Sequence, residues 1–540
     1  MADHGIVVEG LYPRRWWALA VLSLSLVVIG MDNTILNVAL PTLVRDLNAS
    51  ASELQWIVDS YVLVFAGLLL TMGALGDRFG RRLALDAGLL IFLASSIASA
   101  FAGSAEVLIA TRAAMGIGGA LIMPSTLSII TNTFPPEERG RAIAAWAAMA
   151  GLGIVGGPVI GGWLLEHFWW GSVFFVNVPI VGVALLAGLA VVPESKDPRA
   201  TPLDPAGALL SIGGLTALVY GIIEAPENGW TDELTLSALG IAAVLLVAFV
   251  AWEYRTPHPM LRMSFFRDPR FSAASVAITF IFFALFGSIF VLTQHLQFVL
   301  GYSALEAGLR VTPVATLVIG APIAARLVER VGTKVVVASG LFTAAIGLLL
   351  ITNVDVGDGY APIGWALAVI GIGMGATMAP ATESIMGSLP LARAGVGSAM
   401  NDTTRMVGGA LGVAAIGSVL SSSYGSSIAP ALGPLPQSAS AAAEDSVGAA
   451  LEVARRAGPA AGELATAARG AFVDAMGDAL LVGVGVAVLG ALIVLVALPS
   501  RARPTRQEPD AELEPASTGV VADGDPEMGQ TQRVIEGDPR

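Results

Sequence analysis

Three ionisable side chains stand inside apolar stretches of the chain, where a charge is expensive unless it has a partner or a function. Asp32 and Asp59 interrupt the first two stretches, and Arg112 interrupts the fourth. If each stretch is a helix that crosses a bilayer, a rise of about 1.5 Å per residue places all three roughly 8 to 10 Å below the outer surface. Burial favours a neutral carboxyl group and a nearby arginine favours an ionised one. The three residues therefore predict a proton-exchange cluster in which Asp32 takes up a proton and loosens its pairing with Arg112; a permanently ionised structural pair is the alternative, above all for Asp59.

A second group of charges is expected in the C-terminal half. Glu383 and Asp402 lie on either side of a turn near Arg393, so antiparallel helices would bring them to one depth in the inner half. Arg405 follows Asp402 by three positions and shares its helical face. The predicted network of Glu383, Asp402 and Arg405 either binds a cationic ligand or a proton, or locks two helices together. Arg310 is a further base inside an apolar stretch, and the sequence indicates no partner for it.

Methionine and phenylalanine side chains supply candidate contacts for an apolar ligand. Many of the 15 methionines fall in four of the apolar stretches, namely Met115, Met123, Met149, Met374, Met378, Met386, Met400 and Met406. Flexible, polarisable side chains suit a cavity for varied ligands, and filling space between helices is the alternative. A stripe with a spacing of four residues is formed by Phe282, Phe286 and Phe290. It either lines the same cavity or faces lipid. Met123, Met378 and the polar Gln294, near the outer mouth, are the candidates for ligand contact.

Several classes of function are excluded by what the sequence lacks. It has no cysteine, and its four histidines are scattered without the spacing of metal ligands, so neither thiol chemistry nor a metal centre is expected. No phosphate-binding loop ending in Gly-Lys-Ser/Thr occurs, which argues against ATP as the energy source. A glycine pattern at 151–156 fits a dinucleotide fingerprint but lies in an apolar stretch with no strand before it. The formal net charge of −13 argues against a nucleic-acid partner, and no constellation suits catalysis, so neither an enzyme nor a bound cofactor is expected.

The elements that must position these residues are membrane helices. Of the 540 residues, 55% are apolar and 13% are charged, which is too hydrophobic for a soluble globule. Apolar stretches of about 20 residues predict an all-α integral membrane protein with fourteen spans in the order six, two, six. They lie near 16–40, 54–75, 83–103, 106–130, 141–165, 170–192, 204–223, 234–252, 271–294, 305–327, 333–352, 362–388, 395–420 and 479–499.

Lysine and arginine are concentrated in alternate loops, which the positive-inside rule assigns to the cytoplasm together with both termini. The expected divisions are a cytoplasmic N-terminus, a six-helix bundle, a two-helix insertion with its linkers, a second six-helix bundle and a disordered cytoplasmic tail. Their ranges are 1–15, 16–192, 193–270, 271–500 and 501–540. An outer loop at 421–478 is expected either to form short amphipathic helices on the outer leaflet or to be loosely ordered.

A tight basic turn with one acid, from Gly73 to Arg82, separates two of the apolar stretches. Its charged members and its glycines are Asp77, Arg78, Arg81, Arg82, Gly73, Gly76 and Gly80. The glycines let the backbone bend and neighbouring helices approach. Asp77 is expected to pair with a nearby arginine or to face the positive end of another helix. A weaker copy at 329–334 repeats acid, base, glycine and base in the same order, which indicates two halves with one plan.

An internal repeat supports these two halves. Residues 116–118 return about 255 positions later at 371–373, and Gly153, Gly157 and Gly162 return as Gly408, Gly412 and Gly417. Such glycines permit close helix packing, and Pro158 between them loosens the local ladder of backbone hydrogen bonds. Two facing six-helix bundles predict a carrier that works by alternating access, with a site near the midplane.

On these motifs the sequence resembles the major facilitator superfamily, and within it the branch of fourteen-span drug/proton antiporters. Residues 73–83 resemble the inner-loop signature of the superfamily, and residues 108–120, with Arg112 and Gly116, resemble its fourth-span motif. Residues 153–162 resemble the antiporter motif of the fifth span. The first-span motif of the branch is similar to residues 31–41, with Asp32, Asn33, Thr34 and Asn37, although Met31 stands where leucine is usual. The resemblance covers residues 16–500.

The resemblance implies proton-driven export, and the substrates of the family include lipophilic cations, antibiotics and dyes. Hydrophobic, cationic or amphiphilic small molecules, protons and the lipid bilayer are therefore the expected partners, with Asn37 among the contacts. A multi-pass protein of the cell membrane that works as a monomer is expected. The alternatives are an exporter dedicated to one endogenous metabolite or lipid and, from another class, a receptor or scaffold that transports nothing.

Overall fold

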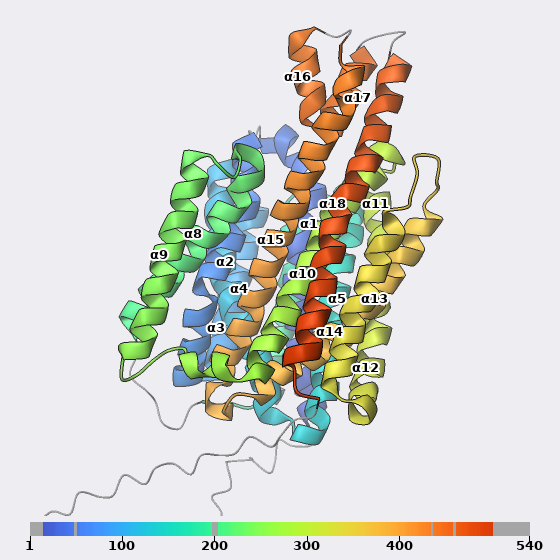
Figure 1. Ribbon diagram of the computed structural model, residues 1–540. Coiled ribbons are helices and arrows are strands. Elements are labelled where there is room, and N and C mark those ends of the chain that lie inside the picture. The colour runs from blue at the N-terminus through green and yellow to red at the C-terminus, as the bar shows by residue number, and fades with distance from the viewer. Residues whose placement is uncertain (1–13, 48–50, 197–203, 434–435, 457–460, 501–540) are drawn as a thin grey trace, which may run out of the picture. The chain divides into compact units, whose positions relative to one another are not determined.

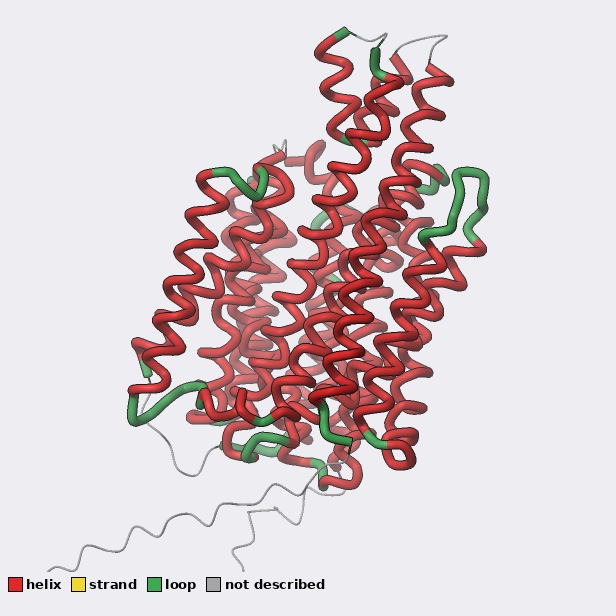
Figure 2. Tube along the Cα trace, in the orientation of Figure 1, coloured by secondary structure: helices red, strands yellow, loops and turns green. Residues whose placement is uncertain are grey.

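The chain folds into long helices with no strand in the ranges that the computed structural model describes, which are 14–47, 51–196, 204–433, 436–456 and 461–500 (Figures 1 and 2). Within these ranges, 14 helical segments are long and apolar enough to cross a membrane. The prediction of an all-α protein with fourteen spans is thus confirmed. The tail predicted to be disordered, 501–540, lies outside the described residues.

The first six spans pack together as one group. They are formed by α1 (Arg15–Leu47), α2 (Ala51–Phe79), α3 (Arg81–Ala100), α4 (Ala105–Thr133), α5 (Pro136–His167) and the pair α6 (Ser172–Phe175) and α7 (Asn177–Val191). α1 packs against α5 and α7, and α4 packs against α2 and α3. These contacts bring the first, second and fourth spans, which carry the predicted charges, together with the sixth around one interior.

Two further helices, α8 (Pro205–Asn228) and α9 (Glu233–Arg255), pack against each other and form the pair at the left edge of Figure 1. Aspartates cap both of them: Asp204 accepts a hydrogen bond from the Gly207 amide, and Asp232 accepts one from Leu234, each at 2.9 Å. α8 contacts α2 of the first group and α15 (Ala394–Ile428). The pair therefore touches both halves of the protein.

The last six spans form the second group. They comprise α10 (Pro269–Gln294), α11 (Ala304–Val311) with α12 (Leu317–Val331), α13 (Thr333–Ile351), α14 (Ala361–Gly387), α15, and α18 (Ala461–Ala497). α10 packs against α15 and α18, and α14 packs against α12 and α13. The two groups meet where α15 contacts α2 and α4, and where α5 contacts α11, α12 and α14.

The region expected to be an outer loop, 421–478, is helical over most of its described residues. α15 continues to Ile428 and α18 begins at Ala461, whereas spans ending near 420 and beginning near 479 were expected. Two short helices, α16 (Gln437–Asp445) and α17 (Val447–Arg456), lie between them. They are held by apolar contacts, because their alanine-rich faces bury Ala443 and Ala450 completely. The region thus contains short helices, which pack on one another and on α15 and α18 (Figure 1), and their expected position on the outer leaflet stays a prediction.

Glycines set the closest helix contacts in the same way in both halves. A Cβ atom built on Gly153 of α5 would lie 3.0 Å from the Cα atom of Val27 in α1. In the second half, a Cβ atom on Gly412 of α15 would lie 2.8 Å from the Cα atom of Phe283 in α10. The backbones of α1 and α5, and of α10 and α15, therefore touch directly. Gly162 differs, since it faces Leu305 of α11 across the two groups.

A larger side chain at this contact should destabilise the protein. We expect Gly153→Val to lower the free energy of unfolding by about 1 to 3 kcal/mol, because an added side chain must push α1 away from α5. The measurement is the thermal unfolding of the purified protein in detergent. Gly240→Val on α9 is the matched control, because a Cβ atom there meets nothing within 4 Å. Equal melting temperatures for the two variants would contradict the packing argument.

Candidate functional site

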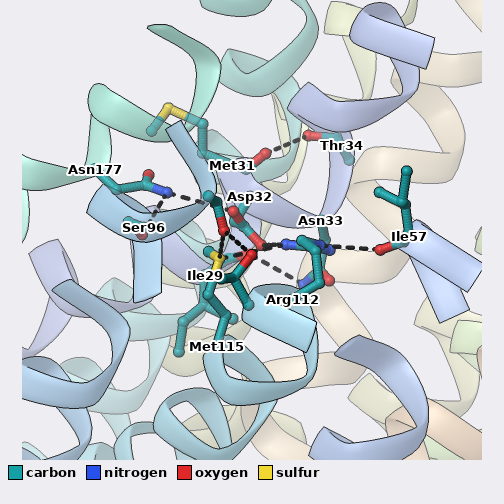
Figure 3. A network of polar contacts seen from close by, with 12 residues as sticks. Ile29, Met31, Asp32, Asn33, Thr34, Ile57, Ser96, Arg112, Met115 and Asn177 are labelled. Atoms are coloured by element: carbon teal, nitrogen blue, oxygen red, sulfur yellow. Dashed lines mark hydrogen bonds and ion pairs between the residues drawn. The ribbon is translucent and has the colours of Figure 1, made fainter. Parts of the chain in front are cut away.

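Asp32 and Arg112 form an ion pair in the interior of the first group of helices (Figure 3). The Asp32 side chain is completely buried, and the Nη1 atom of Arg112 lies 2.5 Å from its Oδ2 atom. The Nε atom of Arg112 donates to the backbone carbonyl of Ile57 at 3.2 Å, and its guanidinium lies 4.4 Å from the centre of the Tyr61 ring. The structure thus brings together the two residues that depth counting placed at one level.

The ion pair has a partner that sequence reasoning missed. Asn177, at the start of α7, donates from Nδ2 to the Oδ1 atom of Asp32 at 3.3 Å and to Ser96 at 3.4 Å. It is a single amide inside the sixth predicted stretch, and no spacing in the sequence pointed to it. Each Asp32 oxygen therefore accepts a hydrogen bond from a different helix, α4 or α7. Asp59 is half-buried on α2, two positions beyond Ile57, and its part in the cluster stays a prediction.

Other polar residues of the first-span motif serve α1 itself or its contact with α5. Thr34 donates to the carbonyl of Ile154 in α5 at 2.9 Å, and Asn33 donates to the carbonyl of Ile29 at 3.0 Å. The side chain of Asn37 lies outside the described part of the structure. Thr34 therefore has a packing role, and the expected ligand contact of Asn37 stays a prediction.

The second charged group is centred on Asp402 and Arg405 of α15. Both side chains are buried, and the Arg405 Nη1 atom lies 3.7 Å from the Oδ1 atom of Asp402. Arg405 also donates from Nη2 to the hydroxyl of Thr382 on α14 at 3.3 Å. Thr382 in turn donates to Asn401 at 3.1 Å, and the Asn401 amide donates to Asp402 at 3.4 Å. The predicted contact between Asp402 and Arg405 is present, with α14 supplying a hydroxyl.

Glu383 is the exception to the expected network. It follows Thr382 in the sequence, so its side chain points about 100° away around α14. Its electrostatic partners in the structure are Arg139 of α5 and Arg270 of α10, and Arg405 is not among them. The prediction that Glu383 joins Asp402 and Arg405 is therefore wrong. Two residues at equal depth on neighbouring helices meet only if their side chains also point toward each other.

Aromatic rings complete the surroundings of Arg405. Its guanidinium carbon lies 4.7 Å from the centre of the Trp146 ring on α5 and 5.4 Å from that of Phe282 on α10. Phe282 is buried, so it lines the interior, and of the other two members of the stripe Phe286 is half-buried and Phe290 exposed. Trp146 was not among the predicted residues. It belongs to the first group of helices, and the arginine belongs to the second.

The remaining predicted residues lie on several helices, and one of the methionines, Met115, contacts Arg112, whose Nη1 atom is 3.9 Å from its sulfur. Met378 is buried on α14, and Met123 packs beside Phe65 on the α2 side of α4. Gln294 donates to the Phe290 carbonyl of its own helix at 3.5 Å. Arg310 has a partner after all, since its guanidinium carbon lies 3.6 Å from the centre of the Tyr302 ring.

The basic turn joins the two halves at the end of the molecule where α3 and α15 begin. Asp77 pairs with Arg81 at 2.7 Å and accepts hydrogen bonds from the backbone amides of Gly395 and Val396, at the start of α15, at 2.8 and 3.1 Å. Both expected roles of Asp77 are thus present, since the first turn of a helix carries partial positive charge. Arg81 donates to the carbonyl of Leu391 at 2.8 Å.

The glycines of the turn allow this contact. A Cβ atom on Gly73 would lie 2.6 Å from the carbonyl oxygen of Gly395, so α2 and α15 meet backbone to backbone. Gly80 has a φ angle of 133°, which side chains rarely adopt. Arg78 lines a cavity of about 170 Å³ together with Asp204, His258 and Arg393 at the same end of the protein.

This chain is similar in sequence to a known family of proteins. Residues 22–413 match the family model described as Major Facilitator Superfamily. The chain is 37% identical over 486 residues to the multidrug efflux pump LfrA of Mycolicibacterium smegmatis, covering 90% of this chain and 95% of that protein. It is 32% identical to the tetracenomycin C resistance and export protein of Streptomyces glaucescens, covering 94% of this chain and 96% of that protein. The methyl viologen resistance protein SmvA of Salmonella typhimurium is 36% identical, covering 85% of this chain and 93% of that protein.

Solved structures agree with the fold. A bacterial homologue of the human lysosomal transporter Spinster, in an inward-facing conformation, matches with a TM-score of 0.55 at 19% identity, covering 91% of this chain and 99% of that one. The human organic anion transporter MFSD10 matches with a TM-score of 0.57 at 15% identity, covering 89% of this chain and 99% of that one. At this level of identity the match supports the fold alone.

The contact of Asp77 with α15 should keep this end of the molecule closed, which a substitution can test. We expect Asp77→Asn to weaken the contact with α15, because a neutral amide interacts less with Arg81 and with the helix start. The chain has no cysteine, so a single Ser398→Cys probe, at a buried position of α15, reports opening through its rate of maleimide labelling. The rate should rise severalfold.

Asp86→Asn is the matched control for this prediction. Asp86 is also an acid at the inner end, on α3, but it pairs with Arg82 at 3.6 Å within its own helix. It should leave the labelling rate unchanged. An unchanged rate in Asp77→Asn would show that the contact does not hold the inner end closed.

Proposed function

Because the chain belongs to the Major Facilitator Superfamily, whose members are transporters rather than enzymes, we propose that it is a proton-coupled antiporter that exports hydrophobic, cationic or amphiphilic small molecules by alternating access. The observation that carries the proposal is the buried pair of Asp32 and Arg112. A carboxylate with an arginine and an amide as its partners, deep in a membrane protein, is a site where one proton changes the local balance of charge. The names of the relatives, which include a multidrug efflux pump and a methyl viologen resistance protein, support drugs as the cargo.

In this proposal the proton acts on the packing of α1. While Asp32 is ionised, it links α1 to Arg112 of α4 and to Asn177 of α7. Once Asp32 is neutral, Arg112 keeps the Ile57 carbonyl and the Tyr61 ring, which are both on α2. Proton uptake thus weakens the connection of α1 to α4 and leaves that of α2 to α4. Proton binding from the outer side would then favour one of two arrangements of the bundles.

The other state of the cycle must break the contacts at the inner end. Asp77 ties α2 to the start of α15, and Arg81 ties the start of α3 to Leu391. An arrangement with this end joined corresponds to the step in which an exported molecule leaves outward. Opening inward requires these bonds to be exchanged for contacts with water, so a moderate free-energy difference separates the two states.

The proposal includes the placement in the membrane. Many basic residues lie at the end of the molecule where α1 and α15 begin, among them Arg81, Arg139, Arg141, Arg262, Arg270 and Arg393. By the positive-inside rule this end is cytoplasmic, and so are both termini. The bundles at 16–192 and 271–500, the insertion at 193–270, the outer region at 421–478 and action as a monomer belong to the same proposal.

A second candidate is an exporter dedicated to one compound. One relative with near-complete coverage is named for resistance to and export of a single compound, tetracenomycin C. Both candidates use the same proton step, so they differ only in the breadth of the cargo. A panel of chemically varied compounds distinguishes them.

Export should depend on the proton gradient. We expect cells that express the protein to accumulate less of a hydrophobic cationic dye than cells without it, and we expect the difference to vanish when a protonophore collapses the gradient. The measurement is dye fluorescence in both strains before and after the protonophore. If accumulation is the same in both strains across cationic, neutral and anionic compounds, drug export by this protein is refuted.

Asp32→Asn tests the proton site directly. The amide keeps the shape of the side chain but has no titratable charge, so proton-driven efflux in proteoliposomes should fall to background. Exchange of labelled substrate down its own concentration gradient needs no proton, so it should persist in this variant. Persistent exchange would show that the variant is folded. Asp86→Asn is the comparison, because it removes a carboxylate that pairs with Arg82 outside this cluster, and it should leave efflux unchanged. Normal gradient-driven efflux by Asp32→Asn would remove Asp32 from the mechanism.

A further inference from the structure

The guanidinium of Arg405 lies against two aromatic rings that come from different halves of the protein. Trp146 on α5 and Phe282 on α10 lie 4.7 and 5.4 Å from its central carbon. Asp402 lies beside it, with 3.7 Å between the nearest nitrogen and oxygen atoms. Two aromatic faces and a carboxylate are the groups that recognise a planar organic cation. Here the planar cation is a side chain of the protein itself.

Arg405 is poorly satisfied in this position. Among the residues that the structure describes, its Nε atom has no hydrogen-bond partner, and neither has the Oδ2 atom of Asp402. Its hydrogen bond to Thr382 measures 3.3 Å. Arg112, by contrast, lies 2.5 Å from its carboxylate and also donates to a backbone carbonyl. A buried donor and a buried acceptor that stay unmatched are unfavourable, so Arg405 is held less firmly than Arg112.

The rings around Arg405 are fixed before any ligand arrives. Trp146 is completely buried, and its indole Nε1 donates to the hydroxyl of Thr126 on α4 at 3.2 Å. Phe282 is also buried, and it stacks on Phe286 at 5.9 Å between ring centres. Arg405 itself has a long, flexible stem. The rings and the carboxylate thus form the rigid part of the group, and the arginine is its movable part.

We propose that Trp146, Phe282 and Asp402 form a binding site for planar organic cations, and that Arg405 is its resident occupant, which the arriving cation displaces. The proposal rests on the proposed export function and assigns it a site. An organic cation with a flat aromatic ring offers more area to the two rings than a guanidinium does, and its charge faces the unmatched oxygen of Asp402. Because Trp146 belongs to the first half and Phe282 and Asp402 to the second, the occupant contacts both halves at once. Neutral flat molecules can stack on the two rings but gain no charge interaction with Asp402.

The test is the affinity of the purified protein in detergent for the planar cation ethidium, measured by fluorescence titration. Removing the resident cation in Arg405→Met should tighten ethidium binding by at least about threefold, because no side chain then competes for the rings. Trp146→Leu and Asp402→Asn should each weaken it by a similar factor or more. If Arg405 only locked two helices together, every substitution in the group would weaken binding or leave it unchanged, so the opposite signs are decisive.

A control variant and a control ligand accompany this measurement. Arg310→Met makes the same chemical change at another arginine stacked on a tyrosine, and it should leave ethidium affinity unchanged. The neutral ring system phenanthridine should respond to Trp146→Leu but not to Asp402→Asn. If Arg405→Met does not fold, Arg405→Gln, which keeps a donor for Thr382, should show the same gain.

The outcomes separate this site from the proposed export. If the wild-type protein exports ethidium from cells and neither Arg405 variant binds it more tightly, the resident-cation site is overturned and export stands. If the wild type neither exports nor binds ethidium, both proposals fail for planar cations. Tighter binding in Arg405→Met together with weaker binding in Trp146→Leu establishes the site.

Discussion

A guanidinium inside an apolar protein must find carboxylate or carbonyl oxygens at hydrogen-bond distance, and this requirement shapes the centre of both halves of the protein. Arg112 meets it, with Asp32 at 2.5 Å and a backbone carbonyl at 3.2 Å. Arg405 meets it in part, with a carboxylate at 3.7 Å and one unmatched nitrogen. In the proposed mechanism, the first pair fixes α1 against α4 until Asp32 takes up a proton, and the looser second pair gives way to another cation.

The charged groups can act on whole bundles because the helices that carry them are rigidly paired. Glycines let the backbones of α1 and α5 touch, and likewise those of α10 and α15. A displacement of α1 at Asp32 is therefore passed to α5, which carries Trp146. In the same way, α15 connects Arg405 with Gly395 at the inner end, where Asp77 binds its first turn. The inner contact and the two charged groups thus share the same few helices, so a change at one biases the others.

The sequence predicted those contacts for which the depth of a residue along its helix was sufficient information. Apolar length and repeated glycines predicted the fourteen spans, and depth counting brought Asp32 to Arg112. Depth failed for Glu383, because its direction around α14 is set by helix packing, which turns it to Arg139 and Arg270. Trp146 and Asn177 were missed because they lie far along the chain from the charges they touch, and a lone indole or amide in an apolar stretch carries no pattern. The outer helices were underestimated because alanine-rich segments resemble loops in hydropathy, although their small side chains pack helix on helix.

The repeat also explains why the two charged groups differ. In the register in which Gly153 contacts Val27 of α1 and its counterpart Gly408 contacts Thr279 of α10, the position of Asp32 is taken in the second half by Ala284, and that of Arg112 by Leu367. Both of these residues are buried. Conversely, Asp402 and Arg405 correspond to Ala147 and Ala150 in the first half. The backbone contacts are thus duplicated while these charges are not, so each half keeps the packing of the repeat and carries a different charged group. In the proposed mechanism, a symmetric frame with asymmetric charges lets a proton and a cationic ligand bind at different places and still act on the same motion, because the shared packing, rather than direct contact between the sites, connects them.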